Sequence, residues 1–333
     1  MRFILIFCSL ICISTHAQTK KYSFSQPKMG SPFIILLYAS DSAKAAQTAS
    51  KAYQLVDSLN VIYSDYLPNS ELSLLSKTAG DNQFHSVSPA MEDILKKSVS
   101  ASEKSDGAYD ITVGQLVKLW RKARKEKQFP ELKSLTIARQ NAGFHQIILD
   151  TINHRVKINK PEILLDLGGI AKGYIAQKVV DFVKNSGIQS VLADAGGDLA
   201  TGTAPPGKTG WSVGVNVPNS EELMQKLVFL QNKAIATSGD MYQYLELNGK
   251  RYSHIIDPKT GLGLTHQRNV TVIAPDGATA DWLATACSIL PVKKSLKLIR
   301  SVRGCELLIA EIRDGKILKW QSEGFGSYLN PEN

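Results

Sequence analysis

The chain has 333 residues, of which 43% are hydrophobic and 21% charged, and its formal net charge is +9. This composition is ordinary for a globular protein, and the length allows one large or two modest domains with a substantial core. Two of the four cysteines lie in the N-terminal segment, and the two others, Cys287 and Cys305, are too few for a disulfide framework. The sequence shows no internal repeat, low-complexity tract or clear linker.

The N-terminal segment has the pattern of a secretory signal. Met1-Arg2 is followed by an apolar run over 3–14 and by small residues that end at Ala17. The run is too short to span a bilayer, and the polar residues 18–21 after it argue against a buried N-terminal strand. We therefore expect residues 1–17 to be a signal peptide that directs export. Bulky residues precede Cys8 and Cys12, which argues against lipidation of either cysteine.

Helices and strands are predicted in chain order from the hydrophobic period. The first half should contain helices over 42–59 and over 89–104, the latter opened by the capping residue Ser88 and a first-turn proline. A helix over 169–185 follows. Strands are expected at 33–38, 145–149, 155–158, 163–167 and 190–193.

The second half is richer in strand patterns. Helices are expected only at 279–290 and 292–302, before a final hairpin whose turn is Arg313-Asp-Gly315. Strands are expected at 211–217, 226–230, 242–247, 252–256, 269–274, 306–312 and 316–320. Helices and strands are mixed without strict alternation, so the sequence indicates the α+β fold class.

The densest basic segment runs from Lys118 to Lys127 and allows two interpretations. It could contact nucleic acid, or it could be the solvated face of a helix whose Leu116, Leu119 and Trp120 turn inward. The second interpretation is favoured, because no aromatic interleaving or binding motif accompanies the charges. We expect no nucleic-acid partner.

The most informative motif is Asp166-Leu-Gly-Gly-Ile-Ala-Lys-Gly-Tyr174, where an apolar run ends as a helix begins. Paired glycines let the backbone approach a ligand, the helix start attracts anions, and Lys172 adds a point charge, so the motif suits phosphate. Tyr174 stands where a Walker A loop needs lysine followed by serine or threonine, which argues against a nucleotide triphosphatase. A tight packing turn would have a similar sequence.

Further segments complete a resemblance. They are Ser64-Asp-Tyr66-Leu-Pro-Asn-Ser-Glu71, Asp106-Gly-Ala-Tyr-Asp110-Ile-Thr112, Gly196-Gly-Asp198, Ala234-Ile-Ala-Thr-Ser-Gly-Asp240, Tyr252-Ser-His-Ile-Ile-Asp-Pro-Lys-Thr-Gly261 and Ala278-Thr-Ala-Asp281-Trp-Leu-Ala-Thr285. In this order they resemble the ApbE family, the FAD:protein FMN transferases, from Met29 to Gly261 and on through Thr285. The resemblance implies one catalytic domain over 18–333 with mixed sheets and flanking helices.

A divalent metal is expected at Asp281 and Thr285. Their spacing places a carboxylate and a hydroxyl on one face of the predicted helix, and both are hard ligands suited to magnesium. A solvated aspartate and a helix-facing threonine would have the same spacing. The resemblance favours the metal and adds the backbone carbonyl of Gly169. Some family members have another carboxylate where this chain has Ala284, which implies an extra water on the metal or weaker binding.

The resemblance also assigns the residues that bind FAD. Tyr66 offers a flat face for stacking, although a half-buried core tyrosine is the alternative, and Asp166 can accept hydrogen bonds while Lys172 faces phosphate. The assigned set is Met29, Tyr66, Ala108, Tyr109, Asp110, Asp166, Lys172 and Ile255.

Catalysis is assigned to Lys172, His254 and Asp257. His254 could act as general base or could orient Asp257 through a hydrogen bond. The predicted signal peptide implies a periplasmic protein that could associate with the inner membrane. The resemblance implies an enzyme that uses magnesium to transfer FMN from FAD to a serine or threonine of an acceptor flavoprotein and releases AMP. The acceptor would itself be exported or membrane-associated. An FAD pyrophosphatase and a non-catalytic flavin-binding protein are the alternatives.

Overall fold

The computed structural model describes residues 19–215, 226–239 and 243–329. Its centre is a sheet of eight strands in which each neighbouring pair is antiparallel. In spatial order the strands are β1 (Lys20–Lys28), β2 (Ser31–Ala39), β6 (Val191–Asp194), β7 (Leu199–Thr201), β10 (Ala234–Gly239), β13 (Gln267–Ala274), β14 (Glu306–Arg313) and β15 (Lys316–Gln321).

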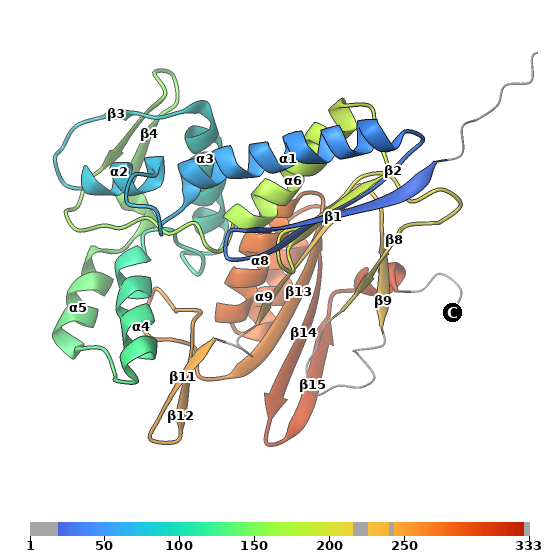
Figure 1. Ribbon diagram of the computed structural model, residues 1–333. Coiled ribbons are helices and arrows are strands. Elements are labelled where there is room, and N and C mark those ends of the chain that lie inside the picture. The colour runs from blue at the N-terminus through green and yellow to red at the C-terminus, as the bar shows by residue number, and fades with distance from the viewer. Residues whose placement is uncertain (1–18, 216–225, 240–242, 330–333) are drawn as a thin grey trace, which may run out of the picture.

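Helices cover one face of this sheet. Alternate residues of each strand point to that face, as Leu307 and Ile309 of β14 do, and they join the main apolar core. Figure 1 shows α1, α6 and α8 lying together over the sheet. The covering helices are α1 (Ser42–Tyr63), α3 (Pro89–Lys104), α6 (Ala171–Asn185), α8 (Gly277–Ile289) and α9 (Val292–Ser301).

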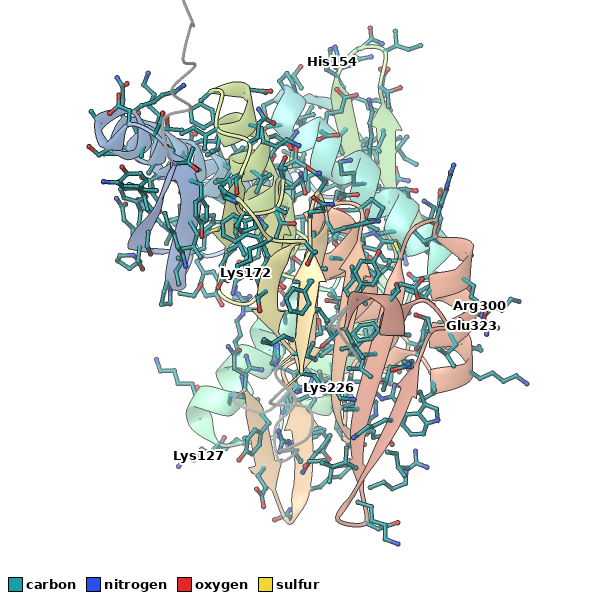
Figure 2. All side chains as sticks on the ribbon, turned by 90° about the vertical axis from the view of Figure 1, so that its right-hand side faces the viewer. Lys127, His154, Lys172, Lys226, Arg300 and Glu323 are labelled. Atoms are coloured by element: carbon teal, nitrogen blue, oxygen red, sulfur yellow. The ribbon has the colours of Figure 1, made fainter. Side chains whose placement is uncertain are left out.

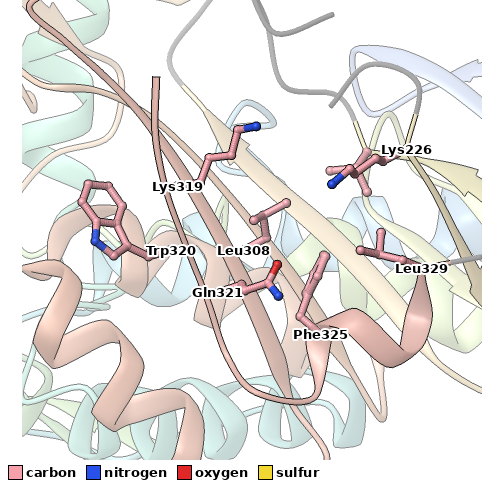
Figure 3. A pocket seen from close by; sticks show the side chains of 8 residues that line it. Lys226, Leu308, Lys319, Trp320, Gln321, Phe325 and Leu329 are labelled. Atoms are coloured by element: carbon pink, nitrogen blue, oxygen red, sulfur yellow. The ribbon is translucent and has the colours of Figure 1, made fainter. Parts of the chain in front are cut away.

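The opposite face of the sheet is covered by a small hairpin and a 3₁₀ turn. The intervening residues of the strands, such as Leu308 and Ala310 of β14, pack there against β8 (Trp211–Gly214), β9 (Leu227–Leu230) and η2 (Phe325–Tyr328). A hollow of about 190 Å³ lies on this side, with Leu308 and Phe325 among its lining residues (Figure 3). None of the predicted site residues lines it.

A lateral part of the molecule carries the remaining elements. One group contains α2 (Glu71–Lys77) and a three-stranded sheet with the order β3 (His85–Ser86), β5 (Arg155–Ile158) and β4 (Ile147–Asp150). The short helix η1 (Phe144–Gln146) directly precedes β4. The other group is a third apolar cluster built by α4 (Gly114–Glu126), α5 (Leu132–Asn141), β11 (Tyr244–Leu247) and β12 (Lys250–Ser253).

Trp120 fixes α4 to the segment that follows β12. It is fully buried, its ring centroid lies 5.2 Å from that of Tyr252, and its Nε1 donates to the Gly261 carbonyl at 2.9 Å. This agrees with the interpretation of 118–127 as part of a helix whose apolar side, with Leu116 and Trp120, is buried. The anchor sets where the segment 254–261 lies relative to α4.

The predicted fold class is confirmed, because helices and antiparallel sheets are mixed along the chain. The predicted strand at 163–167 is wrong. Its apolar residues Ile163, Leu165 and Leu167 are buried, but the backbone makes only an isolated bridge, Val113 with Leu164, instead of joining a sheet. The predictions did not include β1, β3, α2, α5, β7 or β10.

Some predictions fall partly or wholly outside the described residues. The signal peptide over 1–17 lies outside them, as do the end of the predicted strand 211–217 and the first residue of the strand 242–247. Within the described ranges, no helix combines the length and apolar character needed to cross a membrane.

Candidate functional site

The site is built where α6 crosses α8 with the two backbones in contact. A methyl group added to Gly173 would lie 2.1 Å from the Gly277 carbonyl oxygen, and one added to Gly277 would lie 1.9 Å from the Gly173 carbonyl oxygen. Only glycine at both positions allows this approach. As a result Asp281 Oδ2, on α8, accepts a hydrogen bond from the Gly173 amide of α6 at 3.1 Å.

Asp281 is a buried carboxylate, with 4% of its surface exposed. Burial raises its pKa well above the ordinary value, and the negative charge of Asp198 raises it further, whereas the Gly173 hydrogen bond and Lys172 act in the opposite direction. A carboxylate in these surroundings is stabilised in its charged form by a nearby cation. The site therefore favours an additional positive charge at Asp281.

Thr285 lies one helical turn beyond Asp281 and touches the glycine loop. A methyl group on Gly169 would lie 2.7 Å from Thr285 Oγ1, and Thr285 Oγ1 is itself 3.4 Å from Ser238 Oγ on β10. Thus α8 and the loop before α6 bring Gly169, Asp281 and Thr285 together, as the sequence predicts. Within the described residues, no cluster of three or more His, Cys, Asp or Glu is placed to hold a metal, so a metal here would need the hydroxyl and a backbone carbonyl.

The loop between β6 and β7 contributes a residue that the predicted site set did not contain. Gly196 and Gly197 have φ of 80° and 105°, and a methyl group on Gly196 would lie 3.7 Å from Lys172 Nζ. The loop ends in Asp198, whose pKa is raised to about 7 by burial and by Asp194, against the charge of Lys172. The Gly196-Gly-Asp198 motif in the sequence could have indicated that Asp198 belongs to the site.

Lys172 is close enough to Asp198 and Asp281 for its charge to lower the pKa values of both. Figure 2 shows Lys172 above Lys127, which marks the end of α4. Ser31 Oγ, which a methyl group on Gly196 would also meet, is buried without a hydrogen-bond partner in the described part of the chain. An unpaired buried hydroxyl beside a lysine is an arrangement that a polar ligand would satisfy.

A second group of charges surrounds Asp166. Its Oδ1 accepts from the Gly168 amide at 2.7 Å, and its Oδ2 lies 3.3 Å from a guanidinium nitrogen of Arg121, which also pairs with Asp65. Burial and the charge of Asp65 raise the Asp166 pKa, whereas Arg121 and the Gly168 amide lower it. Arg121 and Asp65 were not among the predicted site residues. Asp65 precedes Tyr66 in a motif of the family, whereas Arg121 lies in the basic segment 118–127, which carried no signal for this site.

Tyr66 is open to solvent rather than part of the core. It is 74% exposed, and the Arg121 guanidinium lies 4.3 Å from its ring centroid. The alternative of a half-buried core tyrosine is therefore wrong. The other ring face is available to a planar ligand.

The segment 108–112 supports the site through its shape. Ala108 and Tyr109 are buried, and the Tyr109 ring lies 6.4 Å from that of Trp282 on α8. The Asp110 carboxylate accepts hydrogen bonds from the amide and hydroxyl of Thr112, at 2.8 and 2.6 Å, and from the Phe144 amide at 2.8 Å. Burial raises the Asp110 pKa despite these bonds. Binding of a ligand by Asp110 stays a prediction.

Met29 and Ile255 lie in segments outside the regular helices and strands. Met29 has φ of 51° in the turn between β1 and β2, next to Ser31, and packs against the main core. The Ile255 amide donates to Ser253 Oγ at 3.0 Å, and its carbonyl accepts from the Leu264 amide at 2.9 Å. Their contacts with a ligand stay predictions.

His254 is held by a backbone carbonyl. Its Nδ1 lies 3.2 Å from the Gln243 carbonyl oxygen. Because a carbonyl only accepts, Nδ1 carries the proton and Nε2 keeps its lone pair. The His254 pKa is lowered to about 4. Burial is the largest cause, and the charges of Arg124, Lys172 and Arg121 also lower the pKa, whereas the hydrogen bond with Gln243 raises it. The imidazole is therefore neutral at physiological pH and can accept a proton.

Asp257 shapes a turn instead of pairing with His254. Its Oδ1 accepts from the Lys259 amide at 2.9 Å, and its Oδ2 accepts from Thr260 Oγ1 at 3.3 Å. Among the described residues, its carboxylate receives no hydrogen bond from His254. The predicted hydrogen bond between the two is not formed, because the Asp257 oxygens are used within the turn that leads to Gly261.

Together the fold and the site define an α+β protein with a glycine-built anion site. A lysine, the buried carboxylate of Asp281, the partly buried carboxylate of Asp198 and the Thr285 hydroxyl lie there, and an exposed aromatic ring and a neutral histidine belong to the same site. Such a site fits a ligand that carries both phosphate groups and a planar ring system.

Comparison with known proteins gives the family. The model of the ApbE family matches residues 29–309, and the chain belongs to the ApbE family. It is 30% identical over 318 residues to the FAD:protein FMN transferase of Haemophilus influenzae, covering 92% of this chain and 91% of that protein. It is also 30% identical over 298 residues to the FAD:protein FMN transferase of Escherichia coli strain K12, covering 88% of this chain and 84% of that protein.

Solved structures agree with this assignment. The flavin transferase ApbE from Vibrio cholerae superposes with a TM-score of 0.83 at 26% identity, covering 93% of this chain and 100% of that one. The ApbE protein from Thermotoga maritima gives a TM-score of 0.83 at 27% identity, with the same coverage of each chain.

Proposed function

We propose that this protein is a magnesium-dependent FAD:protein FMN transferase. The observation that carries the proposal is the contact of Gly173 with Gly277, which places Asp281 and Thr285 of α8 against the glycine loop that contains Gly169 and leads to Lys172. The names of the relatives in the same family support the same reaction.

In the proposed reaction, a serine or threonine hydroxyl of an acceptor flavoprotein attacks the phosphorus on the FMN side of the FAD pyrophosphate. A new P–O bond forms, the bond from that phosphorus to the bridging oxygen breaks, and AMP leaves. His254 Nε2, neutral and with a free lone pair, takes the hydroxyl proton. Lys172 holds the phosphates through charge and position.

Magnesium fits the oxygen donors at the site. Asp281 offers a carboxylate, Thr285 a hydroxyl and Gly169 a backbone carbonyl, and all three are hard ligands. Bound there, the ion would neutralise part of the pyrophosphate charge. The raised pKa of Asp281 supports a cation at this position, because the carboxylate is otherwise poorly compensated.

The aromatic end of FAD would lie at Tyr66. Its exposed ring and the Arg121 guanidinium on it form a platform that Asp65 and Asp166 keep in place. Such a platform supports stacking of a flavin or adenine ring.

Export sets which acceptors are available. The predicted signal peptide over 1–17 supports action in the periplasm, at or near the inner membrane, on flavoproteins that are themselves exported or membrane-associated.

Incubation with FAD, Mg²⁺ and a candidate acceptor domain tests the reaction, with intact mass of the acceptor as readout. We expect a covalent gain of FMN that survives denaturation and disappears when the acceptor hydroxyl residue is replaced by alanine. Free FMN and AMP without a labelled acceptor, across several exported flavoproteins, would identify an FAD pyrophosphatase. Tight FAD binding without either product would identify a binding protein.

Variants of α8 test the metal assignment. Asp281→Ala should abolish transfer, whereas Asp281→Asn should keep weak FAD binding and Thr285→Val should have a milder effect, because a neutral ligand contributes less than a carboxylate. Asp314→Asn, at the exposed turn between β14 and β15, is the matched control and should behave as wild type. Near wild-type transfer by Asp281→Ala with magnesium present would refute the assignment.

A further inference from the structure

The part of the molecule built by α4, α5 and the hairpin of β11 and β12 carries much of the net charge of the chain. Residues 118–139 include eight basic and two acidic residues, a net charge of +6 against +9 for the whole chain. Lys122, Lys125, Lys127 and Lys133 of this segment are exposed. Figure 1 shows α4 and α5 beside the hairpin, and the four elements share one apolar cluster. So much positive charge in one place attracts an anionic partner.

Apolar side chains are exposed among these lysines. Phe129 lies in the turn after α4, and Leu132 is the first residue of α5 and is 71% exposed. Ile137 of α5 is exposed as well. Single exposed apolar residues are ordinary on a protein surface, but here three occur within nine residues and between lysines. The segment therefore presents charge and apolar surface together.

Packing fixes the position of Phe129. Its ring centroid lies 5.5 Å from that of Trp120 on α4 and 5.4 Å from that of Tyr252 on β12. Lys250 Nζ lies 5.3 Å from the Tyr252 ring centroid, and Lys127, with φ of 54°, ends α4 just before Phe129. These contacts connect the turn after α4 with the hairpin. The exposed residues of this region form what we call the α4–α5 surface: Lys127, Phe129, Leu132, Lys133 and Lys250.

The mixture of lysines with apolar side chains fits a lipid surface better than a protein partner. Interfaces between proteins are depleted of lysine, whose flexible side chain is costly to order. At a membrane, lysines keep their ammonium groups among the lipid head groups while neighbouring Phe and Leu side chains enter the boundary with the acyl chains. The helix α9 is a useful contrast. Its Lys293, Lys294 and Lys297 are exposed, but none of its large apolar residues is.

We propose that the α4–α5 surface binds the anionic phospholipid surface of a membrane, with Phe129 and Leu132 in the head-group region and the lysines beside lipid phosphates. The net charge attracts the protein from a distance, and the two apolar side chains hold it at the bilayer. The inference goes beyond the proposed function and does not depend on it. Under that function, the docking would bring the enzyme to acceptors that are themselves membrane-associated.

Cosedimentation with lipid vesicles tests the inference. The protein used is residues 18–333, which contain every described element, because the apolar segment 3–14 would itself bind lipid. One set of vesicles is phosphatidylcholine alone, and the other contains an equal amount of phosphatidylglycerol. Binding is measured at about 0.05 M and about 0.5 M NaCl, since salt screens exposed charges.

Two variants change the α4–α5 surface, and each has a matched control. The double variant Lys127→Gln with Lys133→Gln removes two exposed charges, and its control removes two from α9, Lys293→Gln with Lys297→Gln. Leu132→Gln removes an exposed apolar side chain. Its control is Ile152→Gln, in the exposed turn between β4 and β5.

Wild type should bind the vesicles that contain phosphatidylglycerol about tenfold or more tightly than the neutral ones at the lower salt, and this preference should shrink at the higher salt. The double variant on the α4–α5 surface should bind about 25-fold more weakly, about fivefold for each lysine. Leu132→Gln should bind about tenfold more weakly, because a leucine side chain no longer leaves water. Both controls should stay within about twofold of wild type.

Equal binding of wild type to both kinds of vesicle, or binding to neither, would overturn the inference. So would an α9 control that loses as much affinity as the double variant on the α4–α5 surface, because net charge alone would then explain binding. A raised KM for an acceptor protein in Leu132→Gln, without vesicle binding by wild type, would assign the surface to a protein partner instead. Vesicle binding is measured without FAD, so its outcome is separate from that of the transfer assay.

Discussion

Replacing Gly173 by alanine tests whether the contact between α6 and α8 sets the site. In an exposed helix interior, glycine to alanine stabilises a protein by about 1 kcal/mol. Here the added methyl group would lie 2.1 Å from the Gly277 oxygen and 2.9 Å from Asp281 Cβ. Ordinary contact needs about 1 Å more, and neither atom is the end of a flexible side chain. The two helices must therefore separate.

Overpacking of this kind costs about 1–3 kcal/mol. After the gain in helix propensity, we expect Gly173→Ala to lower the free energy of unfolding by about 1–2 kcal/mol. The effect on activity should be larger, because a shift of about 1 Å in a positioned group costs on the order of a hundredfold in rate. The shift would also break the hydrogen bond from the residue-173 amide to Asp281.

Urea unfolding followed by circular dichroism measures stability, and the FMN transfer assay measures rate. Gly214→Ala is the control, since a methyl group there meets no atom within 4 Å. If Gly173→Ala were as stable and as active as Gly214→Ala, the helix contact would not be what positions Asp281.

Three other changes test separate parts of the structure. Tyr66→Ala should weaken FAD binding by about 1–3 kcal/mol in a fluorescence titration; unchanged affinity in a folded variant would remove Tyr66 from the site. Arg268→Met removes one of the two arginines that pair with buried Glu311, leaves Arg313 as the other at 2.6 Å, and should cost about 1–3 kcal/mol in urea unfolding; unchanged stability would show that Arg313 alone compensates the carboxylate. Arg124→Ala should raise the His254 pKa above about 4 in an NMR titration, since loss of a positive charge favours the imidazolium; a constant pKa would separate the two residues.

Periodicity predicted the longer helices well but missed the shorter helices α2 and α5. The helices α3 and α6 lie close to their predicted ranges, 89–104 and 169–185. Strands were less predictable. The segment 163–167 has the apolar pattern of a strand, but burial of side chains does not determine which backbone groups pair. The strand β1 was missed for the opposite reason, since most of its residues are exposed along the edge of the sheet.

The site was predictable only where its residues are close in sequence. The pair Asp281 and Thr285 follows from helical spacing, and Gly169 and Lys172 lie in one glycine loop. The contact of Arg121 with Asp166 joins residues separated by 45 positions, so no local pattern encodes it. The sequence alone suggested that Arg124 is a solvated charge of the basic segment, whereas the structure shows it partly buried and close enough to Arg121 for their charges to interact.

Charge balance predicts that FAD and magnesium bind cooperatively. The charge of Lys172 lowers the pKa values of both Asp198 and Asp281, but burial raises both, helped by Asp194 at Asp198 and by Asp198 at Asp281. A pyrophosphate adds further negative charge to this place, so FAD alone binds at the cost of repulsion from these carboxylates or of their protonation. A cation at Asp281 removes that repulsion, and by linkage each ligand must strengthen the other by the same factor.

Two titrations measure this coupling, that of FAD with and without Mg²⁺ and that of Mg²⁺ with and without FAD. We expect each ligand to raise the affinity for the other at least fivefold, the lower range of coupling between linked sites. Asp281→Asn should reduce the factor, because it removes both the metal ligand and part of the repulsion. Independent binding of FAD and Mg²⁺ to wild type would mean that the ion does not lie between the carboxylates and the pyrophosphate.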